Sequence, residues 1–390
     1  MDEGTGNGEA PSANEAALVL QTVAEFSRRS LASLLPPPEK SILLDVAFRA
    51  AREAAELGIL STEEPTGLGL WDFPERPDSF HLSKRILSLL AETSAAVSWH
   101  FHSLALGRWA CREAGLAGEE AAIAAVEGRC GFARGALFRW LSGQALSEGD
   151  RALLQENFLS PGQGGAPAVV QAGTGWGRAL FPALSRDGLR LEWHLYRREK
   201  LSAEPVGDSH GLEGTASWLL SIPARSEPEE RAHLSGGEAA RLLLHALAIQ
   251  AAGLLAVGVG STRAALRSAR RYSTERRQGG SLIGELPAVQ QLLGEAAANL
   301  EAVETLLESL SVIPKDVREL RRFFAIRAVA HPLLCQAATS ALQVFGGYGY
   351  MRDYGMEKIL RDNQHLKLLG GTPAEIRLCL GAVGEESHVA

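Results

Sequence analysis

The residues best suited to chemistry lie in one glycine-rich stretch near the C-terminus, residues 343–372. Gly346, Gly347 and Gly349 follow a helical segment there. Glycines have no Cβ, so they let backbone N–H groups approach a ligand closely, often a phosphate. The same glycines also suit a tight turn that only ends a helix. The stretch is not a GxGxxG after a strand and no GK[ST] follows it, so neither a Rossmann site nor a P-loop is expected.

Helical patterns at both ends of the chain enclose a β-rich segment. These elements must position the glycine-rich stretch. Apolar residues three and four positions apart predict helices over 41–59, 80–116, 238–277, 286–310 and 316–345. Short apolar runs between turn residues predict strands over 168–173, 188–196 and 217–224. Residues 1–12, which are rich in small and acidic residues, are expected to form a flexible tail. The predicted order is therefore α, β, α.

Composition limits the function classes. The 390 residues are 46% hydrophobic and 22% charged, which is typical of a soluble protein of several domains. The 46 acidic residues outnumber the 39 basic ones, and the net charge of −7 argues against a nucleic-acid binder. The apolar segment 242–262 is interrupted by polar residues and glycines, so a core helix is expected rather than a membrane span.

The four cysteines form no CxxC pair and no Cys/His cluster with zinc spacing, so no metal site is expected. They are interpreted as buried thiols in a reducing compartment. The acidic N-terminus lacks the basic and then apolar layout of a signal peptide. These features predict a cytoplasmic protein.

The segment QVFGGYGYMRDYGMEKILRD, residues 343–362, strongly resembles the signature of the acyl-CoA dehydrogenase family. The resemblance extends to RYSTERRQGGSLIGELPAVQQLL (271–293) and to GLEGTASWLLSIP (211–223), and the α–β–α order is also that family's architecture. The resemblance implies an α+β fold of the acyl-CoA dehydrogenase type. Its parts would be an N-terminal α-helical domain (13–128), a middle β-barrel or sandwich domain (129–237) and a C-terminal four-helix bundle (238–390).

The resemblance also implies FAD, bound at a subunit interface of a tetramer. The positions implied to contact the flavin of a neighbouring subunit are Arg276, Gln278, Gln343, Gly346 and Gly347. Arginine is a permanent planar cation that suits a pyrophosphate group. The alternative is that Arg276 is a solvated helix charge among its neighbours Arg270, Arg271 and Arg277. The family's phenylalanine in the Arg-x-Gln-Phe-Gly stretch is replaced here by Gly279, which removes an apolar contact.

Three further positions are implied to bind the flavin. Phe158 is expected to pack on the flavin ring and Ser160 to hydrogen-bond its reactive edge. An ordinary strand phenylalanine and a turn serine remain the alternative. Thr372, in the Gly-Thr pair after the Arg-Asp motif, completes the implied set.

The catalytic base is the feature that the sequence lacks. Dehydrogenation of a thioester needs a carboxylate to take the α-proton while hydride leaves the β-carbon for the flavin. The resemblance implies two positions for that carboxylate, and here they are Gly370 and Gln250. No Asp or Glu occurs in 239–274 or in 363–374. A relocated base is left open.

Nearby titratable residues are expected to have other roles. Glu357 and Asp362 match structural acids of the family signature, and His245 is expected to be a core residue.

The leading hypothesis is thus an FAD-binding, acyl-CoA dehydrogenase-like flavoprotein that acts on an acyl thioester of coenzyme A or of an acyl carrier protein. An electron-transfer flavoprotein is then a candidate partner. The alternatives are a catalytically silent subunit that completes the flavin site of a hetero-oligomer, a family member with other chemistry in secondary metabolism, and a structural or regulatory protein without flavin. Weak or absent standard dehydrogenase activity is expected.

Overall fold

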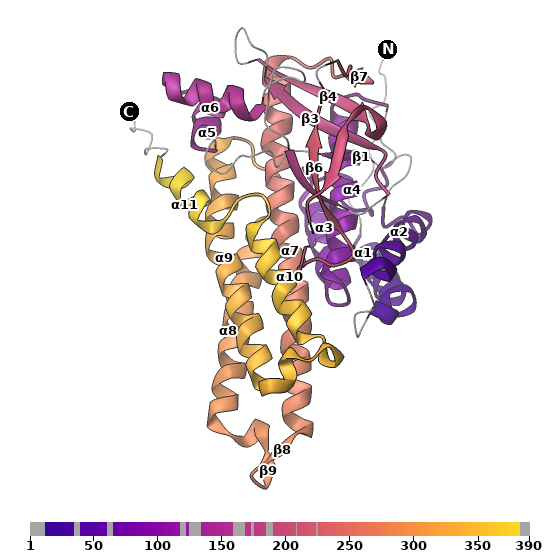
Figure 1. Ribbon diagram of the computed structural model, residues 1–390, viewed down its shortest axis with the longest axis vertical. Coiled ribbons are helices and arrows are strands. Elements are labelled where there is room, and N and C mark those ends of the chain that lie inside the picture. The colour runs from indigo at the N-terminus through magenta and orange to yellow at the C-terminus, as the bar shows by residue number, and fades with distance from the viewer. Residues whose placement is uncertain are drawn as a thin grey trace.

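The computed structural model describes residues 12–34, 40–60, 65–117, 122–124, 134–158, 168–172, 175–184, 190–207, 209–223 and 225–382. Among these residues the N-terminal part is helical, as the sequence predicts. Its α-helices are α1 (Ala13–Phe26), α2 (Lys40–Glu56), α3 (Pro77–Ala91) and α4 (Ala95–Glu113), with a short π-turn and 3-10 turn after α1. In Figure 1 these indigo and purple helices lie beside the long helices of the C-terminal part. The predicted tail falls almost wholly outside the described residues.

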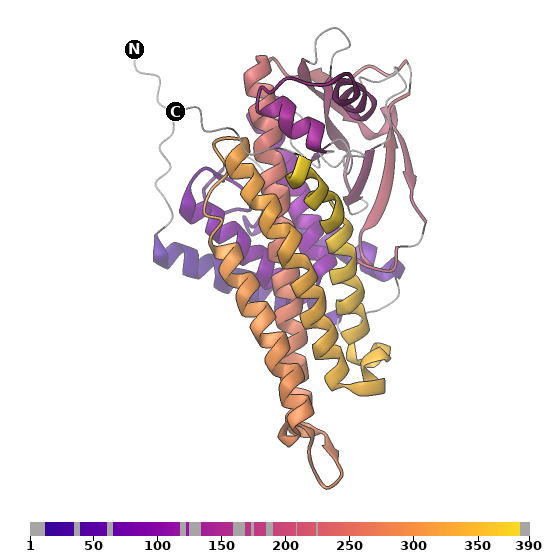
Figure 2. The same cartoon turned by 90° about the vertical axis from the view of Figure 1, so that its left-hand side faces the viewer.

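The C-terminal part is a bundle of long helices. They are α7 (Gly236–Glu275), α8 (Pro287–Glu308), α9 (Val317–Val344) and α10 (Met356–Leu368), and α11 (Pro373–Ala382) packs against α9. Figure 2 shows α8, α9 and α10 running alongside α7. A capping box of Ser235 and Glu238 starts α7, and Asp316 caps α9. Although α7 is long and apolar enough to cross a membrane, 94% of its most apolar window is buried inside the fold, which confirms the prediction of a core helix.

The middle part contains two small sheets. Strands β1 (Ala122–Ala124), β3 (Arg178–Leu184), β4 (Leu191–Arg197) and β7 (Glu230–Arg231) form one sheet in that order, with β1 parallel to β3. Strands β2 (Ala168–Ala172), β6 (Ala216–Ser221) and β5 (Ser202–Pro205) form an antiparallel sheet in that order. The predicted strands correspond to β2, β4 and β6. A separate hairpin, β8 (Arg277–Gln278) and β9 (Ser281–Leu282), lies at the lower end of the bundle in Figure 1.

The prediction of a β-rich segment is wrong for part of residues 129–237. This part forms two helices, α5 (Arg134–Leu141) and α6 (Glu148–Phe158). An ion pair between Arg139 and Asp150 joins the two helices, and Phe138 packs edge-on against Phe324 of α9 with 5.4 Å between ring centroids. Packing against the bundle thus favours helix here, and a single-sequence pattern does not report such long-range contacts.

The N-terminal helices dock on the bundle through backbone contacts as well as apolar side chains. On α3, the Ser88 hydroxyl donates to the carbonyl of Ala256 on α7 at 2.8 Å. A Cβ added to Gly260 of α7 would overlap the Ser88 carbonyl oxygen. Lys84 of α3 donates to the carbonyls of Leu307 (2.7 Å) and Leu310 (2.5 Å), where α8 ends. The closeness of α3 and α7 therefore depends on the glycine.

We expect Gly260→Ala to lower the free energy of unfolding by about 1–3 kcal/mol, because the methyl group would force α3 away from α7. The matched control is Gly294→Ala on α8, where an added Cβ meets nothing within 4 Å. That change should raise the free energy by about 0.5–1 kcal/mol through helix propensity. Urea unfolding of both variants tests the pair, and equal effects would contradict the close contact.

Candidate functional site

The glycine turn ends α9 and carries an exposed aromatic surface. Gly346 has a φ of 58°, a left-handed conformation that glycine adopts without strain. An added Cβ at Gly349 would lie 2.7 Å from the Leu342 carbonyl oxygen, whereas one at Gly347 would meet nothing within 4 Å. Gly349 is therefore needed for packing, and the backbone at Gly347 is open to a ligand.

Arg276 lies beside this turn. It is the C-cap of α7, and its guanidinium carbon lies 5.4 Å from the ring centroid of Tyr348. Gln278 follows in β8, and Gln343 is exposed near the end of α9. We give the residues that the sequence predicts to contact a cofactor at this end of the bundle, together with Tyr348, the name cofactor surface; they are Arg276, Gln278, Gln343, Gly346 and Gly347. The structure thus brings Arg276 to the turn that the sequence singled out, and the exposed donors suit an anionic ligand with a planar ring.

Aromatic stacking supports the cofactor surface from beneath. Tyr272 of α7 stacks on Phe345 with centroids 4.3 Å apart, and Tyr354 packs edge-on against both rings. Burial raises the pKa of Tyr272 above its ordinary value. These rings fix the end of α7 against the turn after α9, so Arg276 and Gly347 are presented on one rigid base.

The other predicted flavin contacts lie away from this surface or outside the described residues. Phe158 is the last residue of α6, and Ser160 lies outside the described residues. Thr372 caps α11: its hydroxyl accepts from the Glu375 N–H at 3.2 Å, and its own N–H donates to the Glu375 carboxylate at 2.7 Å. The roles of Phe158, Ser160 and Thr372 toward a flavin therefore remain predictions.

The first base position, Gly370, lies in a loop held by a cation. Gly370 and Gly371 have φ values of 59° and 98°. Arg327 of α9 is 2% exposed, and its guanidinium donates to the carbonyls of Leu369, Gly370 (2.8 Å) and Gly371 (3.1 Å). A buried guanidinium therefore holds the backbone of this loop, and Gly370 itself has no side chain to act as a base. The sequence analysis did not single out Arg327, because its partners lie more than forty residues further along the chain.

The second base position, Gln250, belongs to a buried hydrogen-bonded chain. The Trp71 indole N–H donates to Nδ1 of His102 at 3.0 Å, and Nε2 of His102 lies 3.0 Å from Oε1 of Gln250. An indole nitrogen can only donate, so Nδ1 must accept and Nε2 must carry the proton that it donates to Gln250. Both nitrogens of His102 are thus engaged, and neither is available to take a proton from a substrate.

His245 lies near Trp109, with ring centroids 6.5 Å apart, and burial lowers its pKa to about 4. This agrees with the expected core role.

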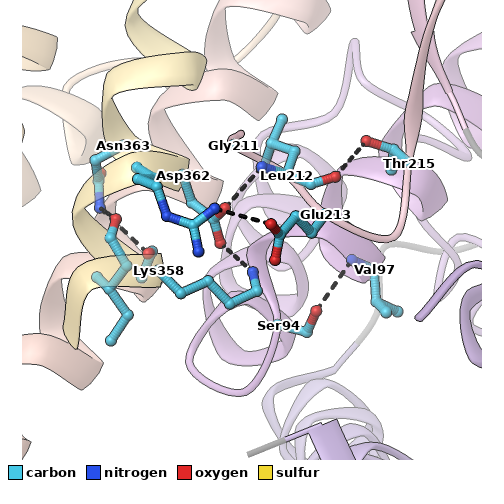
Figure 3. Close-up of polar contacts among 12 residues, drawn as sticks. Ser94, Val97, Gly211, Leu212, Glu213, Thr215, Lys358, Asp362 and Asn363 are labelled. Atoms are coloured by element: carbon cyan, nitrogen blue, oxygen red, sulfur yellow. Dashed lines mark hydrogen bonds and ion pairs between the residues drawn. The ribbon is translucent and has the colours of Figure 1, made fainter. Parts of the chain in front are cut away.

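The Arg-Asp motif on α10 is structural, as the sequence analysis expected. Asp362 accepts from the ammonium of Lys358 at 2.5 Å and from the backbone N–H of Leu212 at 2.6 Å (Figure 3). Arg361 pairs with Glu357 at 2.6 Å and with Glu213 at 2.9 Å. The motif therefore joins α10 to the turn before β6.

The neighbouring Asn363 connects α10 to α7. Its amide donates to the Ser261 hydroxyl at 3.2 Å and to the Ile359 carbonyl at 3.0 Å. Together with Asp362, it places α10 between α7 and the middle sheets. Among the described residues, no group of three or more His, Cys, Asp and Glu side chains is arranged to hold a metal ion, and the thiols of Cys111, Cys335 and Cys379 are buried outside any disulfide.

We expect Asp362→Asn to lower the free energy of unfolding by about 3–5 kcal/mol, because it leaves the Lys358 ammonium buried without its counter-charge. The asparagine oxygen can still accept from Leu212, so the variant tests the charge. Adding Lys358→Met should recover much of the loss. Urea unfolding of the single and double variants measures this, and an additive double variant would contradict a buried pair.

We expect acid to destabilise the fold through its buried histidines. Burial lowers the pKa of His102 to about 4, from an ordinary value of 6.5. The unfolded chain therefore binds a proton that the folded chain does not, so stability is complete above pH 6.5 and falls as the pH drops toward 4. One such histidine should cost about 2 kcal/mol between pH 7 and pH 5.

Urea unfolding of the wild type and of His102→Gln at pH 7 and pH 5 measures this dependence. The variant should lose less stability than the wild type over that range. A wild type that is equally stable at both pH values would overturn the assignment of neutral buried histidines.

Comparisons with known proteins agree with this arrangement. Residues 240–382 match the family model described as "Acyl-CoA dehydrogenase, C-terminal domain". Cyclohex-1-ene-1-carbonyl-CoA dehydrogenase of Syntrophus aciditrophicus is 27% identical over 173 residues, which cover 44% of this chain and 42% of that protein. The chain thus spans less than half the length of this curated relative.

Solved structures match nearly the whole chain. An acyl-CoA dehydrogenase of Bacillus anthracis complexed with FAD gives a TM-score of 0.65 at 17% identity, covering 97% of this chain and 69% of that one. A nitroalkane oxidase crystallized with 1-nitrooctane gives a TM-score of 0.70 at 17% identity and covers 98% of both chains. At these identities the likeness establishes the fold, which confirms the predicted fold class.

Proposed function

Because this chain belongs to the acyl-CoA dehydrogenase family, we propose that it is an FAD-binding, acyl-CoA dehydrogenase-like flavoprotein that acts on an acyl thioester. The thioester would be carried by coenzyme A or by an acyl carrier protein. The observation that carries the proposal is the contact of Arg276 with the glycine turn at Tyr348. We further propose a cytoplasmic oligomer, a dimer or a tetramer, in which this surface meets a second subunit.

The cofactor surface fits FAD by the chemistry of its donors. FAD presents two phosphates and an adenine ring, and the surface offers a permanent cation at Arg276, amides at Gln278 and Gln343, and an open backbone at Gly347. All four positions are exposed in this chain, so they would bind the flavin of a neighbouring subunit. Phe158, Ser160 and Thr372 are proposed to contact the chain's own flavin.

Bound FAD would supply a hydride acceptor for the β-carbon of the acyl group. The α-proton must then pass to a base of the protein, and neither implied position provides one. Gly370 has no side chain, and a glutamine amide such as Gln250 cannot take a proton. His102 is fully engaged by Trp71 and Gln250. We therefore propose that this chain has weak or no standard dehydrogenase activity.

A silent subunit of a hetero-oligomer is the second candidate function. The observation that favours it is the contrast between the exposed cofactor surface and the two base positions, where Arg327 holds the loop at Gly370 and His102 binds Gln250. Such a subunit would complete the flavin site of a related chain that carries its own base. An electron-transfer flavoprotein would then accept the electrons.

We expect Arg276→Ala to weaken flavin retention about tenfold, because it removes a charge-assisted contact with a phosphate. Visible flavin absorbance per mole of purified protein measures this. The matched control is Arg270→Ala, another exposed arginine one to two turns earlier on α7, which should keep its flavin.

Co-expression distinguishes the two candidates. A homo-oligomeric flavoprotein should contain flavin when it is expressed alone. A silent subunit should show flavin absorbance only when it is co-expressed with a related chain. Equal flavin content in Arg276→Ala and the wild type would show that the cofactor surface does not bind it. Rapid anaerobic bleaching of the flavin by octanoyl-CoA would overturn the proposal of a missing base.

A further inference from the structure

Trp71 is held in a backbone conformation that bulky residues avoid. Its φ is 57°, in the left-handed region where a non-glycine residue is uncommon and a bulky one is an outlier. The loop around it is fixed by Asp72, whose carboxylate accepts from the N–H groups of Gly67 and Gly69 at 3.0 Å each. The Trp71 N–H itself donates to the Ser83 hydroxyl at 2.9 Å. Several contacts therefore maintain the strain, which marks the side chain as one with a specific role.

The strained backbone places the Trp71 indole in the interior between α3, α4 and α7. The indole is 0% exposed and meets the His102 ring edge-on, with centroids 5.8 Å apart. Trp99 also packs against His102, with centroids 4.8 Å apart, and its N–H donates to the Gln171 carbonyl at 2.9 Å. We name Trp71, Trp99 and His102 the aromatic plug.

The aromatic plug covers the face of α7 that carries the second base position. Gln250 and Gly253 are three residues apart, so they lie on the same side of the helix. His102 hydrogen-bonds Gln250, and its ring lies so close to Gly253 that an added Cβ would overlap it. An acyl chain that reached Gln250 would have to occupy the volume that the imidazole and the Trp71 indole fill.

We propose that the aromatic plug excludes an acyl chain from the interior beside Gln250, so that Trp71 and His102 determine which acyl groups this chain admits. The proposal rests on the proposed function, since it assumes that Gln250 marks the place of an acyl group. A thioester bound by this chain would have its acyl group short, or outside this interior.

The test is Trp71→Gly, which removes the indole and places glycine at a left-handed position. In the wild type, coenzyme A and octanoyl-CoA should bind within about threefold of each other, because the eight-carbon chain finds no apolar volume. In Trp71→Gly, octanoyl-CoA should bind at least about tenfold more tightly than coenzyme A. Isothermal titration calorimetry measures both ratios. A wild type that already prefers octanoyl-CoA tenfold, or a variant with no preference, would overturn the proposal.

The matched control is Trp193→Gly, which empties an equally buried site where the indole donates to the Ala239 carbonyl at 3.0 Å. It should gain no preference for octanoyl-CoA. His102→Ala supplies a second variant for the case that Trp71→Gly does not fold. His102 lies within α4, where alanine suits the helix, and the substitution removes the ring that covers Gly253.

Free octanoate separates failure of this proposal from failure of the proposed function. It should raise the melting temperature of Trp71→Gly or His102→Ala and leave the wild type and Trp193→Gly unchanged. If no variant binds coenzyme A but octanoate still stabilises only the plug variants, the thioester function is wrong and the aromatic plug stands. If octanoate stabilises the wild type or neither plug variant, the plug itself is wrong.

Discussion

The buried carboxylate of Asp362 is the interaction on which the arrangement of the site depends. It binds the Lys358 ammonium on its own helix and the N–H of Leu212, a residue with a left-handed φ of 53°. A Cβ at Gly211 would lie 2.6 Å from the Arg361 carbonyl oxygen, so the turn can pack this closely against α10 only with glycine at this position. Because this turn leads into β6, Asp362 holds the middle sheets against α10 together with the ion pair between Arg361 and Glu213. The next residue, Asn363, joins α10 to α7 through its hydrogen bond to the Ser261 hydroxyl.

The long helices and their glycine turn could be predicted from the sequence because their signals are local. Helical periodicity marks α7, α8 and α9, and the spacing of Gly346 and Gly347 marks the turn. Helices α5 and α6 could not be predicted in this way. Their structure depends on contacts such as that between Phe138 and Phe324, which lie far apart in the sequence. Strand β3 was also not predicted, although it pairs with the predicted β4 along its whole length.

The site residues likewise differ in whether a local sequence signal or only a long-range contact identifies them. Arg276 and the glycine turn were both singled out from the sequence, and the structure places Arg276 beside Tyr348 of that turn because both flank the ends of predicted helices. The aromatic plug had no comparable signal. Trp71 and His102 lie 31 residues apart, and His102 and Gln250 lie 148 apart. A lone tryptophan in a glycine-rich loop resembles any core residue until its φ is known. The sequence could show that Gln250 is not a carboxylate, but it could not show what surrounds that side chain.

At Gly370 and Gln250, the two positions that the resemblance implies for the base, the absence of a carboxylate avoids a cost in folding stability. A carboxylate kept inside an apolar pocket as a base must be desolvated, and this lowers the stability of the folded state. At Gly370 that cost is absent, and the terminal nitrogens of the buried Arg327 guanidinium donate to backbone carbonyls. At Gln250 a neutral amide binds a histidine whose pKa has fallen to about 4, so this network carries no charge near neutral pH. The exposed donors at Arg276 and Gln343 bear no such burial cost. The interior beside Gly370 and Gln250 is thus held by hydrogen bonds and packing without a buried carboxylate, and this physical arrangement is the basis for proposing weak or absent dehydrogenase activity.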